Sequence, residues 1–255
     1  VSSGGKITNI NTKNTAYIYL SAGAFANSTY ILHGSMFVSQ GAIASNTSVV
    51  DQMCILSGGY AKQVNLIANI AELYISSGGY ANSVSVNLGS MYIASGGTAT
   101  NISWTPGLGH LDIQDGAYVT YTKSLRGVYW GEYSLLSSSV QMSSKTVYKG
   151  SMYVMQSGHA SSNTIMLSGQ MHVWSNGSAT ANTVSSGGFI AISKGGYAIN
   201  NNVGASGSMF VFTGGSADKT TVFSSGAIHI GDKGGVEAGL LGYHINKLRV
   251  IALVS

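Results

Sequence analysis

The sequence predicts an all-β fold, a right-handed parallel β-helix (β-solenoid) of about twelve coils with about 19 residues each. Three observations support this prediction: a Gly-Gly-x-Ala string that recurs at a nearly fixed spacing, alternating apolar residues on both sides of each string, and a single proline. A fixed period of roughly 20 residues is typical of repeat architectures, in which each unit stacks on its neighbours.

The glycine strings set the period of the repeat. Successive copies, clear or degenerate, lie 17 to 20 residues apart, except for one interval of 41 residues that begins at Val119. We interpret this interval as two coils of which one has lost the motif, so that an eroded or looped coil lies within 104–149. The clear copies end at Ala61, Ala81, Ala99, Ala198 and Ala217.

Apolar and polar residues alternate before and after each glycine string, which is the pattern of a β-strand. Each unit therefore reads as strand, glycine turn, strand and second turn. Glycine supplies the positive φ of tight corners, and the near absence of proline keeps the backbone N–H groups available for strand pairing. The residues expected to point inward include the pairs Met36/Val38, Met91/Ile93, Met152/Val154, Met171/Val173 and Met209/Val211.

The repeat defines the expected domains. Residues 1–236 form one β-solenoid repeat domain, and residues 237–255 are apolar and lack the glycine rhythm. Because an open sheet edge invites pairing with another chain, we expect 237–255 to be a C-terminal cap or the start of the next module. The chain begins at Val1 without an initiator Met, and we expect it to be part of a longer protein.

The composition excludes several classes of protein. Charged residues make up only 8% of the chain against a usual ~25%, and the mean hydropathy of +0.21 argues against charge-driven disorder. No apolar run approaches the ~20 residues of a membrane helix, so we expect no membrane insertion by this segment. The 12 Lys and Arg are scattered, which argues against a nucleic-acid partner.

Residues 77–104, SGGYANSVSVNLGSMYIASGGTATNISW, resemble the strand-loop-strand repeats in the passenger domains of AIDA-type autotransporter adhesins. The resemblance implies a secreted passenger displayed on a bacterial cell surface, which acts in cell adhesion, autoaggregation or biofilm formation and is not an enzyme. It also implies surface glycans of host or bacterial cells, or self-association, as partners. Finally, it implies O-glycosylation of repeat serines by a dedicated heptosyltransferase.

Two outward columns of aromatic residues are expected to run along the solenoid. One lies between the two inward residues upstream of the glycines, and the other lies just before the repeat alanine. Rings stacked at the coil spacing stabilise a sheet by roughly 0.2–1 kcal/mol per pair, and an exposed aromatic stripe is alternatively a surface for sugar stacking or partner binding. The candidate binding residues are Tyr19, Phe37, Tyr74 and Tyr92 in the first column and Tyr60, Tyr80 and Tyr118 in the second.

Serines near the turns are the candidate acceptors for O-glycosylation. Ser28, Ser45, Ser83 and Ser161 follow the repeat alanine or its immediate neighbour. The alternative role of such hydroxyls is to satisfy backbone groups of the turn.

Carboxylates in the eroded stretch open one enzymatic alternative. Asp112 and Glu132 are about one coil apart, so they are expected to stand on adjacent coils near the separation of about 5 Å found in retaining glycosidases, with Asp115 close by. On this alternative the chain is a carbohydrate-active β-helix enzyme, a polysaccharide lyase or hydrolase. A further alternative is a purely structural spacer. No cofactor is expected, and the six histidines lie too far apart in sequence to predict a metal site.

Overall fold

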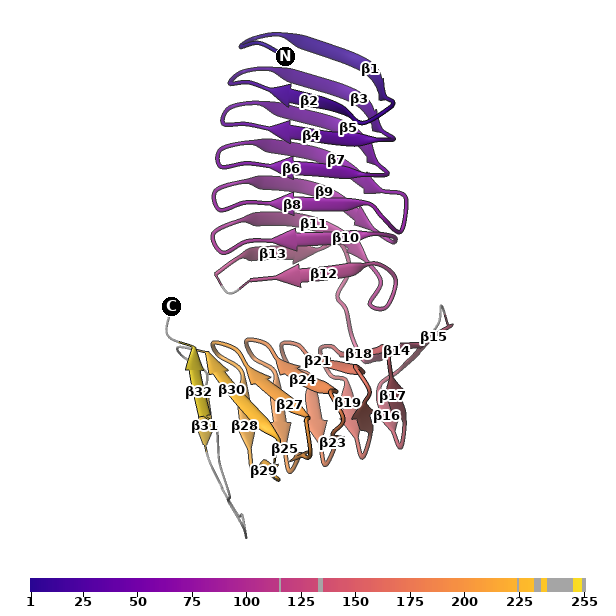
Figure 1. Cartoon of the computed structure of the whole chain (residues 1–255), viewed down its shortest axis with the longest axis vertical. Coiled ribbons are helices and arrows are strands. Elements are labelled where there is room, and N and C mark those ends of the chain that lie inside the picture. The colour runs from indigo at the N-terminus through magenta and orange to yellow at the C-terminus, as the bar shows by residue number, and fades with distance from the viewer. Residues whose placement is uncertain (115, 133–134, 224, 232–234, 238–249, 254–255) are drawn as a thin grey trace. The chain divides into compact units, whose positions relative to one another are not determined.

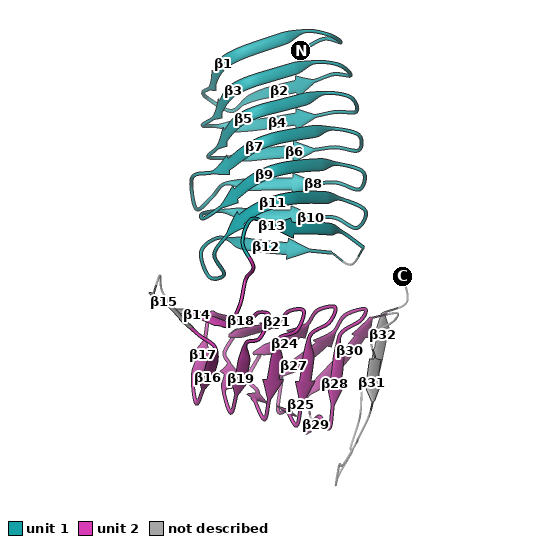
Figure 2. Ribbon diagram, turned by 180° about the vertical axis from the view of Figure 1, so that it is seen from behind, with its two compact units in different colours: residues 1–123 teal, residues 124–255 magenta. Residues whose placement is uncertain are grey.

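The computed structural model describes residues 1–255 except 115, 133–134, 224, 232–234, 238–249 and 254–255 (Figure 1). Its described residues form strands and turns and no helix. Parallel strands stack into a β-solenoid of about 11 turns, about 19 residues apart, which confirms the predicted all-β parallel β-helix. The chain forms two compact units, Val1–Lys123 and Ser124–Ser255 (Figure 2).

Unit 1, residues 1–123, builds each coil from one long and one short strand. The long strands form a seven-stranded sheet: β1 (Lys6–Thr12), β3 (Phe25–Ile31), β5 (Ile43–Val49), β7 (Tyr60–Leu66), β9 (Tyr80–Val86), β11 (Thr98–Trp104) and β13 (Tyr118–Tyr121). The short strands form a six-stranded sheet: β2 (Ala16–Leu20), β4 (Gly34–Val38), β6 (Gln52–Ile55), β8 (Glu72–Ile75), β10 (Ser90–Ile93) and β12 (His110–Ile113).

Unit 2, residues 124–255, builds most of its coils from three short strands and therefore has three sheets. The first contains β15 (Leu135–Ser139), β14 (Val128–Glu132), β18 (Ser151–Val154), β21 (Gln170–Val173), β24 (Phe189–Ile192), β27 (Ser208–Val211), β30 (Ala227–Gly231) and β32 (Val250–Leu253). The second contains β16 (Gln141–Ser143), β19 (His159–Ser161), β22 (Ser178–Thr180), β25 (Tyr197–Ile199), β28 (Ser216–Asp218) and β31 (Gly235–Glu237). The third contains β17 (Thr146–Tyr148), β20 (Thr164–Met166), β23 (Thr183–Val184), β26 (Asn202–Val203) and β29 (Thr221–Val222).

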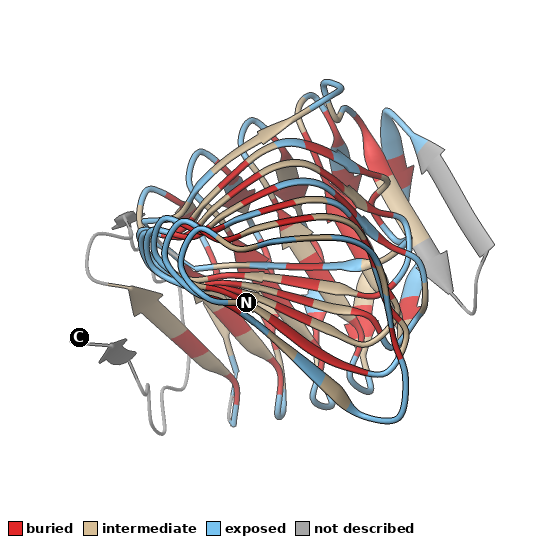
Figure 3. Cartoon of the chain, turned by 90° about the horizontal axis from the view of Figure 1, so that it is seen from above, coloured by how far each residue is buried: buried red, intermediate tan, exposed pale blue. Residues whose placement is uncertain are grey.

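The core lies inside the coils, where every second residue of a strand is buried (Figure 3). Met36, Met53, Leu73 and Met91 stack in register on successive short strands of unit 1, and each is 0% exposed. In unit 2, Met209 has the equivalent inward place. All five predicted inward pairs are buried, so this prediction is confirmed.

The two glycines of the repeat have different roles at the turn. Gly58 has φ +71°, a conformation that side chains rarely adopt, whereas a Cβ on Gly59 would lie 2.2 Å from the carbonyl oxygen of Val38 on the preceding coil. The first glycine is thus needed for its backbone conformation and the second for close packing of the coils.

The division between the units falls inside the stretch predicted to be eroded. The sequence analysis treats 1–236 as one repeat domain, whereas the structure separates the chain between Lys123 and Ser124. The first strand after the division, β14, runs antiparallel to both β15 and β18, unlike the parallel pairs that make up the coils. Loss of the glycine motif in this stretch removes the turn that would carry the chain into another parallel coil.

Part of the predicted C-terminal cap lies outside the described residues, namely 238–249 and 254–255. Within it, β32 pairs in parallel with β30, with Val250 opposite Ile228. The last described strand of this sheet therefore follows the coil register of unit 2.

Candidate functional site

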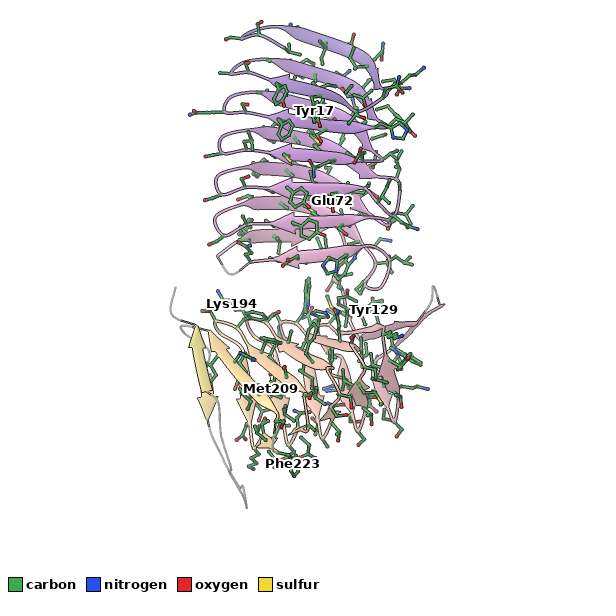
Figure 4. All side chains as sticks on the ribbon, in the orientation of Figure 1. Tyr17, Glu72, Tyr129, Lys194, Met209 and Phe223 are labelled. Atoms are coloured by element: carbon green, nitrogen blue, oxygen red, sulfur yellow. The ribbon has the colours of Figure 1, made fainter. Side chains whose placement is uncertain are left out.

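The outward face of the six-stranded sheet in unit 1 carries two side-by-side columns of residues. The strand register places one residue of each short strand in a line, which we call the aromatic column: Tyr19, Phe37, Cys54, Tyr74, Tyr92 and Asp112. Two residues earlier in each strand is a second line, which we call the polar column: Tyr17, Ser35, Gln52, Glu72, Ser90 and His110. Figure 4 labels Tyr17 and Glu72 of the polar column.

The rings of the aromatic column stack in pairs. Tyr19 and Phe37 have ring centroids 5.0 Å apart with planes 7° from parallel, and Tyr74 and Tyr92 have centroids 4.7 Å apart with planes 11° from parallel. Stacked rings cover each other's faces, so within each pair the solvent meets ring edges rather than the faces between the rings. The predicted column thus exists, and its rings serve sheet stability wherever two of them are adjacent.

Hydrogen bonds join the polar column to the aromatic one. The Ser35 hydroxyl donates to Gln52 Oε1 at 3.1 Å, and Gln52 Nε2 donates to Glu72 Oε2 at 3.3 Å. The same Glu72 oxygen accepts a hydrogen bond from the Tyr74 hydroxyl at 3.0 Å. Three successive coils are therefore linked through side chains on their outer face, with the carboxylate of Glu72 at the centre.

The carboxylate changes the acidity of its neighbours. Desolvation and the hydrogen bond to Glu72 raise the pKa of Tyr74 to about 12. Burial, and to a smaller extent the charge of Glu72, raise the pKa of the Cys54 thiol. Both groups are therefore protonated and neutral at physiological pH.

The second predicted column lies on the outward face of the seven-stranded sheet. The register aligns Lys6, Phe25, Ile43, Tyr60, Tyr80, Thr98 and Tyr118. Only Tyr60 and Tyr80 form a stacked pair here, with centroids 5.3 Å apart, and the Tyr80 hydroxyl lies 2.9 Å from Thr100 Oγ1. Tyr118 at the end of the sheet is 60% exposed.

Unit 2 continues the same outward positions with a mixed set of rings. Tyr153 stacks on His172 with centroids 5.1 Å apart, and Phe210 stacks on His229 at 4.6 Å. Between these pairs the column has Ala191, which is only 5% exposed, and the ring of Phe189 makes edge contacts with His172 and Phe210. The column is therefore continuous in aromatic contact although one of its members is an alanine.

The structure does not bring the three candidate carboxylates onto one sheet. Asp112 lies on β12 of unit 1, where it pairs with Tyr92, whereas Glu132 lies on β14 of unit 2, which pairs with β15 and β18. The expectation that Asp112 and Glu132 stand on adjacent coils is therefore wrong, because β14 turns antiparallel instead of continuing the sheet of β12. Asp115 lies outside the described residues.

The candidate serines lie at the bend after the repeat alanine, and all four are half-buried. Ser28 and Ser83 have positive φ values of 53° and 58°, whereas Ser45 and Ser161 occupy the position before this bend. They therefore belong to two different columns. Their geometry fits the alternative role of shaping the turn.

The serines of the glycine turns were missed by the sequence analysis. Ser57, Ser77 and Ser95 each precede the positive-φ glycine and are exposed. A Cβ on Gly78 would meet Ser57 Oγ at 2.8 Å, and one on Gly96 would meet Ser77 Oγ at 2.7 Å, so each serine lies against a glycine of the next coil. The signal was in the sequence, since a serine before Gly-Gly recurs in three successive units.

Two searches of the described residues found nothing that bears on function. No three His, Cys, Asp or Glu side chains among them lie close enough together to hold a metal ion. The described part of the chain also has no helix with the length and apolarity needed to cross a membrane.

Comparisons with known proteins give one structural similarity. No protein-family model matches the chain, and no curated protein sequence matches it significantly. Among solved structures, the chain is similar to a crystal structure of a TibA fragment hyper-glycosylated by TibC, with 25% identity over 92% of this chain and 91% of that chain. The TM-score of this match is 0.33, which is too low to establish a shared arrangement.

Proposed function

We propose that this chain is part of the passenger of a secreted, surface-displayed bacterial adhesin, which mediates cell adhesion, autoaggregation or biofilm formation without catalysing a reaction. The observation that carries the proposal is the outward face of the six-stranded sheet, where aromatic and hydrogen-bonding side chains repeat on every coil. The resemblance of residues 77–104 to AIDA-type passenger repeats supports the same function.

The proposed mechanism is multivalent contact. Each coil offers a similar weak contact, and repetition raises the overall avidity by roughly 10²–10⁴ over one contact when several are engaged together. The partners are glycans on host or bacterial surfaces, or a second copy of the chain. Such a surface needs no catalytic group.

The test is binding by the whole chain. The chain, coupled at several copies per bead, is applied to a glycan array, and cells that display it are followed by the fall in turbidity as they settle. We expect glycan binding or settling that weakens strongly when the chain is presented as single copies. Absence of both glycan binding and settling would reject the adhesin proposal.

We further propose that a glycosyltransferase modifies the turn serines Ser57, Ser77 and Ser95. They are exposed, whereas the four serines chosen from sequence are half-buried. The measurement is the intact mass of the chain from its native host against the unmodified 26.3 kDa. Replacing the three turn serines by alanine is expected to remove most of any added mass, while replacing Ser28, Ser45, Ser83 and Ser161 serves as the matched control and leaves it.

A further inference from the structure

The aromatic column of unit 1 is interrupted at one coil. Cys54 lies in register with Phe37 on one side and Tyr74 on the other, and it points outward because its strand neighbours Met53 and Ile55 are fully buried. The thiol is far shorter than a ring. A stretch of the outer face therefore lacks a ring between two rings that differ by two coils.

The two rings that border this interruption each have a partner only on their far side. Phe37 stacks on Tyr19, and Tyr74 stacks on Tyr92. The faces of Phe37 and Tyr74 that are directed toward Cys54 are therefore covered by no ring of the aromatic column. These are the ring faces that the stacked pairs leave available for a ligand.

The coil spacing decides which kind of ring fits between them. Adjacent strands are about 4.8 Å apart, so Phe37 and Tyr74 on alternate coils are separated by about 9.6 Å. Two van der Waals contacts of about 3.5–4.0 Å account for about 7–8 Å, which is all that a flat aromatic ring needs. The remaining distance of about 2 Å suits a thicker, puckered ring such as a pyranose.

The polar column supplies hydrogen-bonding groups beside the same interruption. Gln52 is two residues before Cys54 on the same strand face, and Glu72 and Ser35 are its neighbours on the adjacent coils. A carboxylate and an amide together accept and donate hydrogen bonds, as sugar hydroxyls require. Glu72 also bonds the Tyr74 hydroxyl at 3.0 Å, which holds that ring in place before any ligand arrives.

We propose that Phe37 and Tyr74 hold one pyranose ring of a neutral glycan between them, above Cys54, with its hydroxyl groups bonded to Glu72 and Gln52. A sugar whose substituents are all equatorial fits best, because both of its faces then present only C–H groups to the two rings. This inference rests on the proposed glycan-binding function and names the site and the class of sugar for it.

The experiment uses Cys54 as a reporter, because it is the single cysteine of the chain. The full chain is alkylated with iodoacetamide at about pH 9, where a thiol of raised pKa still has some thiolate, in the presence of increasing methyl β-glucoside. At ten times its Kd the sugar is expected to slow alkylation about elevenfold. Methyl β-galactoside, with an axial hydroxyl on one face, is expected to protect less, and mannitol, which has no ring, not at all.

Two variants and one control make the result specific. Tyr74→Ala is expected to abolish the protection while leaving Cys54 reactive, and Tyr60→Ala on the other sheet is expected to leave it unchanged. Cys54→Tyr, which fills the interruption with a ring, is expected to abolish saturation-transfer NMR signals from the glucoside even if Tyr74→Ala does not fold.

The failure of this inference differs from the failure of the proposed function. Protection that does not saturate, or that mannitol produces equally, overturns the site. If glycan binding or cell settling persists in that case, the adhesin proposal stands on other contacts. If glycan binding and settling are both absent as well, both proposals fail.

Discussion

The two units build the same coil but fill one inward position with different chemistry. In both, a positive-φ residue follows the repeat alanine at a distance of two, and the next residue points inward. In unit 1 this residue is threonine or an aliphatic residue, whereas in unit 2 it is mostly asparagine. The unit 1 residues are Thr29, Thr47, Val64, Val84 and Ile102, and those of unit 2 are Asn163, Asn182, Asn201 and Thr220.

The asparagines form a buried ladder of hydrogen bonds. Asn163 donates to Asn182 Oδ1 from both its backbone N–H and its side-chain amide, each at 3.0 Å, and Asn182 donates in the same way to Asn201. The Asn182 amide also donates to the carbonyl of Ala160, at 3.2 Å. Each side chain takes over a hydrogen bond of the backbone, which explains why the long strand of unit 1 is two short strands in unit 2.

The comparison teaches that one repeat accommodates two ways of fixing the register of coils. Unit 1 relies on apolar burial, which is strong but tolerant of the partner's identity. Unit 2 relies on directional bonds, in which every buried amide depends on its neighbours. The ladder is therefore the more sensitive of the two to a single change.

The largest effect is expected from breaking the ladder at its middle. Asn182→Ala leaves the backbone N–H and the amide of Asn163 buried without an acceptor, which costs about 3–5 kcal/mol in the free energy of unfolding of unit 2. The matched change Val84→Ala in unit 1 removes two methyl groups and costs about 2 kcal/mol. Urea denaturation of each variant measures the difference, and equal losses would contradict the comparison.

The converse change places a single asparagine in the apolar column of unit 1. Val84→Asn buries an amide between Val64 and Ile102 and is expected to cost about 1–3 kcal/mol. Adding Val64→Asn provides a partner, and the pair is expected to recover about 1 kcal/mol relative to the sum of the single changes. A double-mutant cycle by thermal unfolding gives the coupling, and a coupling of zero would show that the column cannot form a ladder.

A smaller effect of opposite sign is expected at the threonines of the same column. The hydroxyls of Thr29 and Thr47 are buried without a hydrogen-bond partner in the structure. Thr47→Val exchanges the hydroxyl for a methyl group, as the next coil already does with Val64, and is expected to raise the stability by about 1 kcal/mol. Thr47→Ser is the control: it keeps the hydroxyl, loses the methyl group and should lower the midpoint of urea unfolding.

The smallest effect concerns pH and the outer face of unit 1. Because the pKa of Tyr74 is raised to about 12, the folded chain keeps a proton that the unfolded chain releases above its ordinary pKa near 10. This contribution to stability is complete below about pH 10 and is lost as the pH rises through 12. Glu72→Gln should lower the pKa of Tyr74 in an NMR titration of labelled tyrosines, and an unchanged value would exclude the carboxylate as a cause.

Much of this architecture could be predicted from the sequence because a repeat fixes long-range pairing. Once the period is known, the alternation around Gly-Gly-x-Ala places Met91 inside and Tyr92 outside, and the columns follow. The antiparallel direction of β14 could not be predicted, since a strand alternates in the same way whichever direction it runs. Asn163 and Asn182 were recognised only as polar members of an inward set, because their bonds depend on register between coils.

The candidate site was predictable as a set of positions but not as a surface. The sequence placed Phe37, Cys54 and Tyr74 in one column, yet the pairing of rings on either side of Cys54 depends on side-chain orientation. In the same way, the exposure of Ser57 and the half-burial of Ser28 follow from the shape of each turn.

The antiparallel strand β14 has a consequence for how the repeat can evolve. A coil duplicated or deleted between β18 and β30 leaves the pairing of β14 with β18 unchanged, because each coil contacts only its neighbours. The length of unit 2 is thus free to change in whole steps of about 19 residues. Insertions of any other length shift glycines away from their turns, so β14 marks a fixed origin from which coils are gained or lost.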